Sequence, residues 1–188
     1  AQEAAASASD LIDAAEQRIF EIRQGKDVAN LTPIKQIITS ENSRISSLSD
    51  PEVRKLSRGI PLGLSGIDAV LGGMNRSDLI IIGARPGVGK TSFSLNIARN
   101  AAVNSGKRVA FFSLEMSKEQ LVSRLLSSES AIESQKLRWG GLSGDDEWER
   151  LANASANLYK TEIFIDDTAA ITVPQMKAKL RRNKVDLV

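Results

Sequence analysis

Residues 80–92 read IIIGARPGVGKTS and bring together an apolar run, a glycine-rich turn, a lysine and two hydroxyls. The pattern A-x-x-x-x-G-K-T over residues 84–91 is that of a phosphate-binding loop, whose stricter form has glycine where this chain has Ala84. Gly87 and Gly89 allow backbone angles that other residues avoid, so consecutive N–H groups can curl around an anion. A helix that begins at such a loop points its positive end at the β-phosphate. The pattern therefore predicts a nucleoside triphosphate site.

Two side chains of the loop have defined chemistry in such a site. Lys90 would reach the β- and γ-phosphates, and the Thr91 hydroxyl would ligate Mg²⁺. The alternative is a fortuitous glycine-rich turn, and the position of the loop between an apolar run and an amphipathic stretch argues against it. The residues expected to hold the nucleotide are Ala84, Arg85, Pro86, Gly87, Val88, Gly89, Lys90, Thr91 and Ser92.

A carboxylate for catalysis stands at the end of the next apolar run. Glu115 closes the stretch RVAFFSLE, and side chains at the carboxyl ends of parallel strands face the ligand crevice of an α/β sheet. From there Glu115 could orient and deprotonate a water for attack on the γ-phosphorus. The alternative is a solvated glutamate or a helix cap. Asp166 and Asp167 end a third apolar run in the same way, where a structural or turn role is an equal alternative.

The composition excludes several other chemistries. The 188 residues contain no histidine and no cysteine, which rules out imidazole bases, thiol nucleophiles, disulfides and the usual zinc sites. A net charge of +2 does not by itself indicate nucleic-acid binding. NKVD at 183–186 matches the base-reading motif of GTPases, but it follows a basic helix instead of an apolar strand, so we interpret it as chance. No apolar run approaches the ~18 residues of a membrane span, and a cytosolic protein is expected.

The rest of the chain alternates apolar runs with amphipathic stretches. Strands are expected at 79–83, 108–115, 163–167 and 185–188, the first of them buried on both faces. Helices are expected at 11–24, 32–48, 91–106, 145–159 and 172–181, and one more follows a capping box of Ser117 and Gln120. Residues 58–78 are rich in loop formers. Strands that alternate with helices predict right-handed crossovers and an α/β fold with a mostly parallel sheet.

The two upstream helices carry apolar stripes with few partners in their own segment. Thr32 is expected to cap the second of them, with Pro33 in its first turn. The stripe must pack either within this chain or on another subunit. Trp148 falls on an amphipathic stripe and is expected in the core, whereas the place of Trp139 stays open. The basic run at 177–184 fits a solvated helix face better than a DNA-binding stripe.

Three stretches together resemble the RecA-like ATPase domain of DnaB-type replicative DNA helicases. They are RGIPLGLSGIDAVLGGMNRSDLIIIGARPGVGKTSFSLNIA, VAFFSLEMSKEQLVSRLL and IFIDDT, and the run SLEMS is the most specific part. The resemblance covers about residues 58–188 and implies the N-terminal part of a RecA-like P-loop NTPase core. Residues 1–57 resemble the helical region that links the family's N-terminal domain to its motor, with the linker helix at about 32–48.

The resemblance also implies an activity and its partners. Lys90 and Thr91 match the family's phosphate- and magnesium-binding residues, and Glu115 matches its catalytic glutamate. ATP and Mg²⁺ are the implied cofactors of a homo-hexameric ring that encircles single-stranded DNA and unwinds forked DNA, with 5′ to 3′ polarity. Primase and a helicase loader are the implied partners, at the replication fork of the bacterial nucleoid. The linker helix would pack on the motor domain of the neighbouring subunit.

The chain begins without methionine and ends at Val188 inside an apolar run, so we expect a piece of a longer protein that stops within the Walker B strand. In the family this strand continues to an aspartate that supports magnesium, and later segments carry the DNA-contacting loops and an arginine for the neighbouring site. Asp186 lies too early to replace that aspartate. The chain alone should then bind nucleotide weakly and hydrolyse little. Two alternatives stay open: a RadA-type ATPase of recombination or repair, and a nucleotide-switched assembly module without unwinding.

Overall fold

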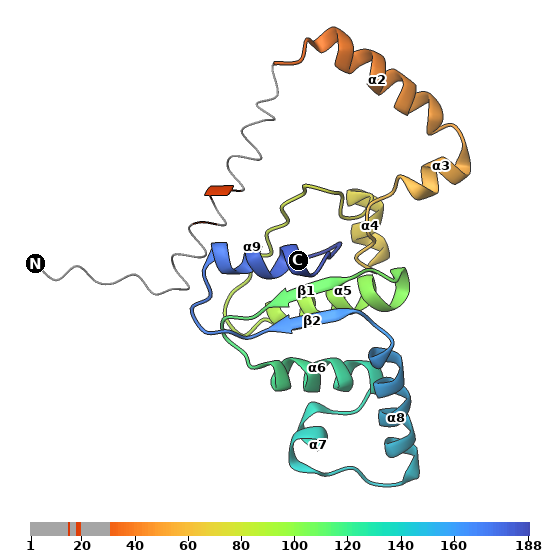
Figure 1. Cartoon of the computed structure of the whole chain (residues 1–188). Helices are drawn as coiled ribbons and strands as arrows, with labels where there is room; N and C mark the ends of the chain where they lie inside the picture. The colour runs from red at the N-terminus through yellow and green to blue at the C-terminus, as the bar shows by residue number, and fades with distance from the viewer. Residues whose placement is uncertain (1–14, 16–17, 20–30) are drawn as a thin grey trace, which may run out of the picture. The chain divides into compact units, whose positions relative to one another are not determined.

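A computed structural model of the chain describes residue 15, residues 18–19 and residues 31–188 (Figure 1). The chain divides into two compact units, one of residues 1–57 with 172–181 and one of residues 58–171 with 182–188. The helix expected at 11–24 lies outside the described residues, apart from residues 15, 18 and 19, which are helical.

The first unit contains α2 (Ile34–Ser47), α3 (Pro51–Leu56) and most of α9 (Val173–Arg182). The cap expected from Thr32 is wrong, because Pro33 occupies the N-cap position of α2 and its side chain makes no capping hydrogen bond. α3 was not among the helices expected from the sequence. It forms because the Asp50 carboxylate accepts the Glu52 N–H at 2.8 Å, and Pro51 begins the helix with a preset backbone angle.

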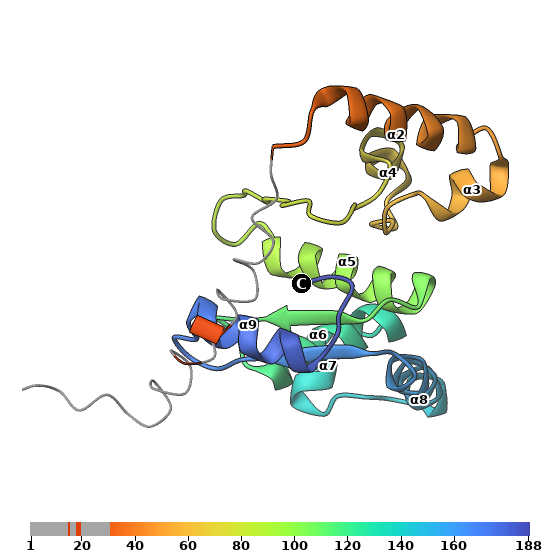
Figure 2. The same cartoon turned by 45° about the horizontal axis from the view of Figure 1, so that its top comes forward.

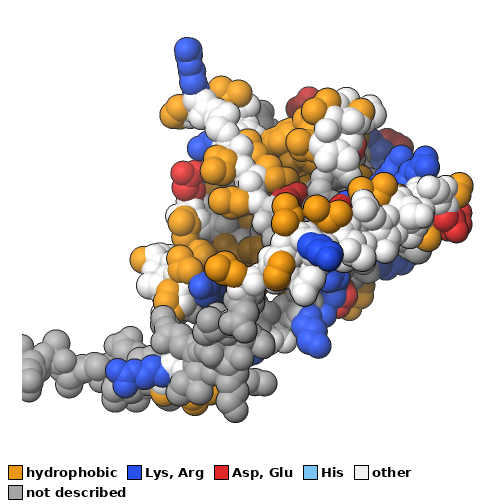
Figure 3. All heavy atoms as spheres, turned by 90° about the horizontal axis from the view of Figure 1, so that it is seen from above, with side chains coloured by type: hydrophobic (Ala, Val, Ile, Leu, Met, Phe, Trp, Pro, Cys, Tyr) orange, Lys and Arg blue, Asp and Glu red, His pale blue; other side chains and the backbone are white. Residues whose placement is uncertain are grey.

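α2 has an apolar stripe that none of the described residues buries. Four isoleucines of this stripe are between 51% and 72% exposed, namely Ile34, Ile37, Ile38 and Ile45. Figure 3 shows one face of the molecule, on which many apolar side chains lie open at the surface. Between them Glu41 accepts a hydrogen bond from Arg44, and this bond lowers the pKa of the Glu41 carboxyl. A helix with such a stripe gains most of its stability only when another surface covers it.

The second unit holds α4 (Ser65–Leu71), α5 (Lys90–Ser105), β1 (Val109–Phe112), α6 (Lys118–Ser130), α7 (Ser134–Trp139), α8 (Asp145–Tyr159) and β2 (Ile163–Asp166). β1 and β2 are parallel, with Val109 opposite Ile163 and Phe112 opposite Asp166. Three helices form the crossover between them, and α5 lies along β1 (Figure 1, Figure 2). The expected α/β architecture with a parallel sheet is therefore confirmed, over two strands.

Two other expected strands differ from the prediction. The run at 79–83 pairs with no strand among the described residues, and Leu79 and Ile81 are 85% and 83% exposed. A strand buried on both faces was therefore the wrong expectation here, because a strand requires the N–H and C=O groups of a neighbour and none lies beside this run. The run at 185–188 forms a single bridge, between Leu187 and Val109, on the edge of β1 that faces away from β2.

The core of this unit lies between one face of the sheet and two helices. The strand residues that share this face are Val109, Phe111, Ile163 and Ile165. The helix residues packed against them are Leu95, Ala98, Ala101 and Ala102 of α5, and Leu121 and Leu125 of α6. Alanines on α5 let its backbone approach the sheet closely, while leucines fill the space between the two helices. α5 and α6 therefore lie side by side on the same face of the sheet.

The excursion from Ile60 to Met74, which carries α4, is closed at its base. These two residues form an antiparallel bridge with both N–H to carbonyl distances at 2.8 Å. Gly59 and Gly73 face each other beside it, and a Cβ on Gly73 would lie 2.6 Å from the Gly59 carbonyl oxygen. Inside the excursion the Asp68 carboxylate accepts three consecutive N–H groups, those of Leu62, Gly63 and Leu64. The segment that the sequence indicated only as loop is thus a fixed structure.

Candidate nucleotide-binding site

The glycine-rich loop leads directly into α5. Gly89 is the N-cap of this helix at φ +109°, and Gly87 has φ +80°, both in the region that favours glycine. A Cβ at either position would meet no atom within 4 Å, so the need for glycine comes from the backbone angle and not from space. The first helical bond runs from the Phe93 N–H to the Gly89 carbonyl at 2.9 Å. The three N–H groups before Phe93 therefore have no carbonyl partner in the helix and form an anion-binding end.

Three side chains predicted to act here are not used to hold the fold. The Lys90 ammonium, the Thr91 hydroxyl and the Glu115 carboxylate make no hydrogen bond or ion pair with any residue that the structure describes. Lys90 and Glu115 are exposed, and Thr91 is half-buried in the first turn of α5. The described part of the chain contains no cluster of three acidic residues that could hold an ion alone. With the Thr91 hydroxyl as the protein ligand, the site fits a Mg²⁺ ion whose other ligands are water and nucleotide phosphates.

Glu115 stands on a tight turn that follows β1. The strand ends at Phe112, three residues earlier than expected, and the buried Ser113 begins the turn. The Ser113 hydroxyl donates to the Met116 carbonyl at 2.7 Å and accepts the Met116 N–H at 3.0 Å. Glu115 is the exposed tip of the loop that these two bonds close. Its position beyond the carboxyl end of β1 agrees with the prediction, although it is not part of the strand.

The end of β2 holds the chain just after this turn. The N–H of Lys118, the first residue of α6, donates to the Asp167 carboxylate at 3.0 Å. Asp166 accepts the N–H of Thr168 at 3.0 Å and its hydroxyl at 2.6 Å. Both aspartates therefore take part in structural hydrogen bonds, which is one of the roles that the sequence left open.

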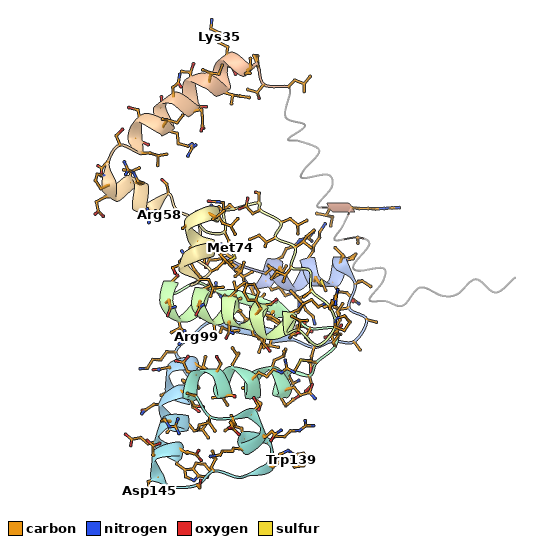
Figure 4. All side chains as sticks on the ribbon, turned by 180° about the vertical axis from the view of Figure 1, so that it is seen from behind. Lys35, Arg58, Met74, Arg99, Trp139 and Asp145 are labelled. Carbon is orange, nitrogen blue, oxygen red and sulfur yellow. The ribbon has the colours of Figure 1, made fainter. Side chains whose placement is uncertain are left out.

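Three polar contacts show how α6 lies along α5. In the order of the chain they are Ser92 with Arg124, Asn96 with Ser128, and Arg99 with Glu129. The first two contacts each join residues 32 apart, so the two helices run parallel. The helix starts, Lys90 and Lys118, are only 28 residues apart, so the N-terminus of α6 extends about four residues, or roughly 6 Å, beyond the N-terminus of α5. Arg99, labelled in Figure 4, lies on the side of α5 that faces α6. The Glu115 turn precedes α6 and therefore lies ahead of the N-terminal end of α5, where the glycine-rich loop is.

Other residues singled out in the sequence lie away from this site. Trp148 is 58% exposed, so its expected place in the core is wrong, and Glu147 beside it takes the inward position on α8. Trp139 is 78% exposed at the end of α7 (Figure 4). The Asp186 carboxylate accepts the Arg108 N–H at 2.9 Å, so it helps to hold the 185–188 segment beside β1.

A groove that the sequence analysis missed lies along α6. Its volume is about 680 Å³. Most of its lining side chains are apolar and come from α6, α7, α8 and β2: Val122, Leu126, Leu137, Leu151, Ile163 and Ile165, with Lys118, Glu119 and Ser123 at polar positions. The signal in the sequence was the second apolar stripe on α6, Val122 and Leu126, beside the buried stripe of Leu121 and Leu125.

One carboxylate joins the two helices that wall this groove. Glu147 of α8 accepts from the Lys136 ammonium of α7 at 2.6 Å and from the Ser143 N–H at 2.8 Å. Both bonds favour the charged form, the lysine bond more strongly, and they lower the pKa of Glu147 below its usual 4.5.

Known proteins with similar sequences were compared with the chain. Residues 59–188 match the family described as the DnaB-like helicase C terminal domain. The replicative DNA helicase DnaB of Geobacillus stearothermophilus is 44% identical over 176 residues, which are 93% of this chain and 38% of that protein. The replicative DNA helicase DnaC of Bacillus subtilis is 43% identical over the same shares. The chain thus spans less than two fifths of these relatives.

Solved structures give the same assignment. One of them, described as an ATPase domain, has a TM-score of 0.70 and 27% identity, over 82% of this chain and 52% of that one. A DnaB-like replicative helicase described with its interactions with primase has a TM-score of 0.71 and 26% identity, over 92% and 40%. None of the helices in the described ranges is long and apolar enough to cross a membrane. With more than half of its length matched by one family, the chain belongs to the DnaB-like helicase C-terminal domains.

Proposed function

We propose that the intact protein is an ATP-dependent replicative DNA helicase and that this chain supplies part of its motor. The observation that carries the proposal is the phosphate loop at the start of α5 with the Glu115 turn ahead of it, in a chain of this family. The protein forms a hexameric ring that couples ATP hydrolysis to 5′ to 3′ movement along single-stranded DNA. It acts in the cytoplasm, at the replication fork.

Each residue of the site has a role in this proposal. The N–H groups of residues 87–91 bind phosphate oxygens of ATP, and Lys90 neutralises charge on the β- and γ-phosphates. The Thr91 hydroxyl would hold Mg²⁺, and the ion would supply positive charge beside the phosphate oxygens. Glu115 orients the attacking water and accepts its proton. Glu115 is exposed and forms no ion pair with any residue in the described part of the chain, and both facts support this assignment.

The linker helix and the groove along α6 suggest how subunits meet. We propose that α2 of one subunit lies in this groove of its neighbour, since the four exposed isoleucines of α2 need an apolar partner surface. Ile38→Glu on α2 and Leu126→Glu in the groove should each shift the intact protein to smaller assemblies in light scattering. Lys35→Glu, which changes charge on α2 without touching the stripe, is the matched control. If the Ile38→Glu and Leu126→Glu variants both still form hexamers, this docking is contradicted.

Primase and a helicase loader are the proposed partners. The similar solved structure of a DnaB-like helicase, described with its interactions with primase, supports the first of them.

Two other functions compete with unwinding. A RadA-type recombination ATPase would hydrolyse ATP without primary unwinding, and an assembly module would use nucleotide only to change its oligomeric state.

Strand separation on a forked duplex with a 5′ tail tests the proposal, with ATP and Mg²⁺ and the full-length gene product. Lys90→Ala should abolish both hydrolysis and unwinding, and Glu115→Gln should bind ATP but hydrolyse it at least about 100-fold more slowly, the usual contribution of a general base. Hydrolysis without strand separation would favour the recombination ATPase. Robust hydrolysis by the 188-residue chain alone would contradict our expectation that it is poorly active.

A further inference from the structure

Ser92, at the inner end of the phosphate loop, is contacted by a cation from the neighbouring helix. The Arg124 guanidinium of α6 donates from Nη1 to Ser92 Oγ at 3.1 Å. No further partner of either side chain occurs among residues 31–188. Arg124 is exposed and Ser92 is half-buried, so a contact of this kind contributes little to stability by itself. Its position one residue after Thr91 suggests a different purpose.

The contact leaves the Ser92 proton available. A serine hydroxyl has one proton and two lone pairs, while an arginine side chain only donates, so Arg124 occupies a lone pair of Ser92. Ser94, two residues later, gives its proton to the Lys90 carbonyl at 3.0 Å, the ordinary bond of a serine inside a helix. Ser92 makes no bond of this kind to the described chain before it. Its hydroxyl can therefore donate to an acceptor at the phosphate-binding end of α5.

We propose that Arg124 is a positioning residue of the nucleotide site, which holds the Ser92 hydroxyl so that it donates to a phosphate group that ADP and ATP share. The inference rests on the proposed function. In the proposed site Lys90 and Thr91 serve the β- and γ-phosphates, and Ser92, one residue later in α5, would serve the phosphate nearer to the nucleoside. The positive charge of Arg124 also makes the Ser92 hydroxyl a stronger donor to an anion.

A purely structural role can be separated from this one by a matched contact. Ser128 of α6 donates to Asn96 of α5 at 3.2 Å, one helical turn farther from the loop on both helices. This contact is exposed, as Arg124 is. If Arg124 only helps α6 to dock on α5, removing either contact should have the same effect on the nucleotide site.

The experiment uses the full-length gene product with Arg124→Ala, Ser92→Ala, the double variant and Ser128→Ala. Fluorescent ADP and a fluorescent, non-hydrolysable ATP analogue measure binding, and steady-state kinetics measure turnover. Arg124→Ala and Ser92→Ala should each weaken both nucleotides by about 3- to 10-fold, and KM should rise while kcat changes little, because the bond is made before and during hydrolysis alike. The double variant should bind no more weakly than Ser92→Ala, since Arg124 acts through Ser92.

Three results would overturn the inference: an equal loss in Ser128→Ala, additive losses in the double variant, or unchanged binding in Arg124→Ala. A loss for the ATP analogue but not for ADP would also contradict it, because it would place the contact at the γ-phosphate. The Lys90→Ala variant tests the proposed function separately from the role of Arg124. If that variant still hydrolyses ATP, the proposed function fails; if it is inactive while Arg124→Ala binds normally, only the role of Arg124 fails.

Discussion

Removing the Ser113 hydroxyl should separate the stability of the second unit from the placement of Glu115, the proposed general base. Ser113 is 8% exposed, and its hydroxyl makes two bonds, to the carbonyl and to the N–H of Met116. A hydrogen bond of this kind contributes about 0.5–1.5 kcal/mol, so Ser113→Ala should lower the free energy of unfolding by about 2 kcal/mol. Urea titration of the 188-residue chain measures this loss.

The same change should act on turnover through Glu115, which lies at the tip of the turn. A general base contributes about 10²- to 10⁴-fold, and a turn that has lost both of its closing bonds holds that base only part of the time. We expect kcat of the full-length protein to fall by about 10-fold, less than for Glu115→Gln, with KM nearly unchanged because the phosphate loop is intact.

Ser127 gives the matched control at the other end of α6. Its hydroxyl donates to the Ile132 carbonyl at 2.6 Å and accepts from the Ser134 hydroxyl at 2.9 Å, so it also closes a turn with two bonds. Ser127→Ala should lose stability to a similar degree and keep normal turnover. If Ser113→Ala is destabilised but hydrolyses ATP at the wild-type rate, the turn does not place Glu115 and the reasoning is refuted.

Three further predictions concern the core, the loop and the groove wall. Leu121 is 0% exposed, so Leu121→Ala should lower the free energy of unfolding by about 3 kcal/mol in urea titrations, against less than about 1 kcal/mol for Val122→Ala at 42% exposure. Gly89→Ala places a Cβ at φ +109° and should cost about 1–3 kcal/mol and weaken ADP binding in calorimetry; unchanged affinity would mean that the loop adapts. The bonds to Glu147 lower its pKa, so they stabilise the fold above pH 4.5 and that contribution is lost as the pH falls through the lower folded value. Urea titrations should show Glu147→Gln less stable than wild type at about pH 7, and a gap of the same size at about pH 3 would contradict the assignment.

Local signals in the sequence predicted much of the second unit. Gly89 and Gly106 mark the two ends of α5 because each adopts a left-handed backbone, and the capping box of Ser117 and Gln120 starts α6 as expected. Thr172 likewise donates its N–H to the Gln175 side chain before α9. These features depend only on residues close in the chain, so the sequence alone is enough to place them.

Features that depend on distant partners were harder to predict. The apolar run at 79–83 reads as a buried strand, yet its pairing depends on a neighbour that its own composition does not reveal. Trp148 was expected on the buried face of α8, but Glu147 lies on that face and bonds to Lys136. The hydrophobic pattern of a sequence does not predict a charged residue on the packed side of a helix. The contact of Arg124 with Ser92 depends on the register of two helices, which follows from packing and not from spacing.

The bridge between Ile60 and Met74 gives the chain a convenient place for engineering. Because the two ends of this excursion are hydrogen-bonded to each other, a change at its far end should leave the position of the following segments unchanged. Val70 of α4 is 83% exposed, and Gly72 ends the helix shortly after it. A fluorophore or a short affinity peptide attached at Val70 could therefore be used to test the proposed ring assembly without changing the sequence of the glycine-rich loop.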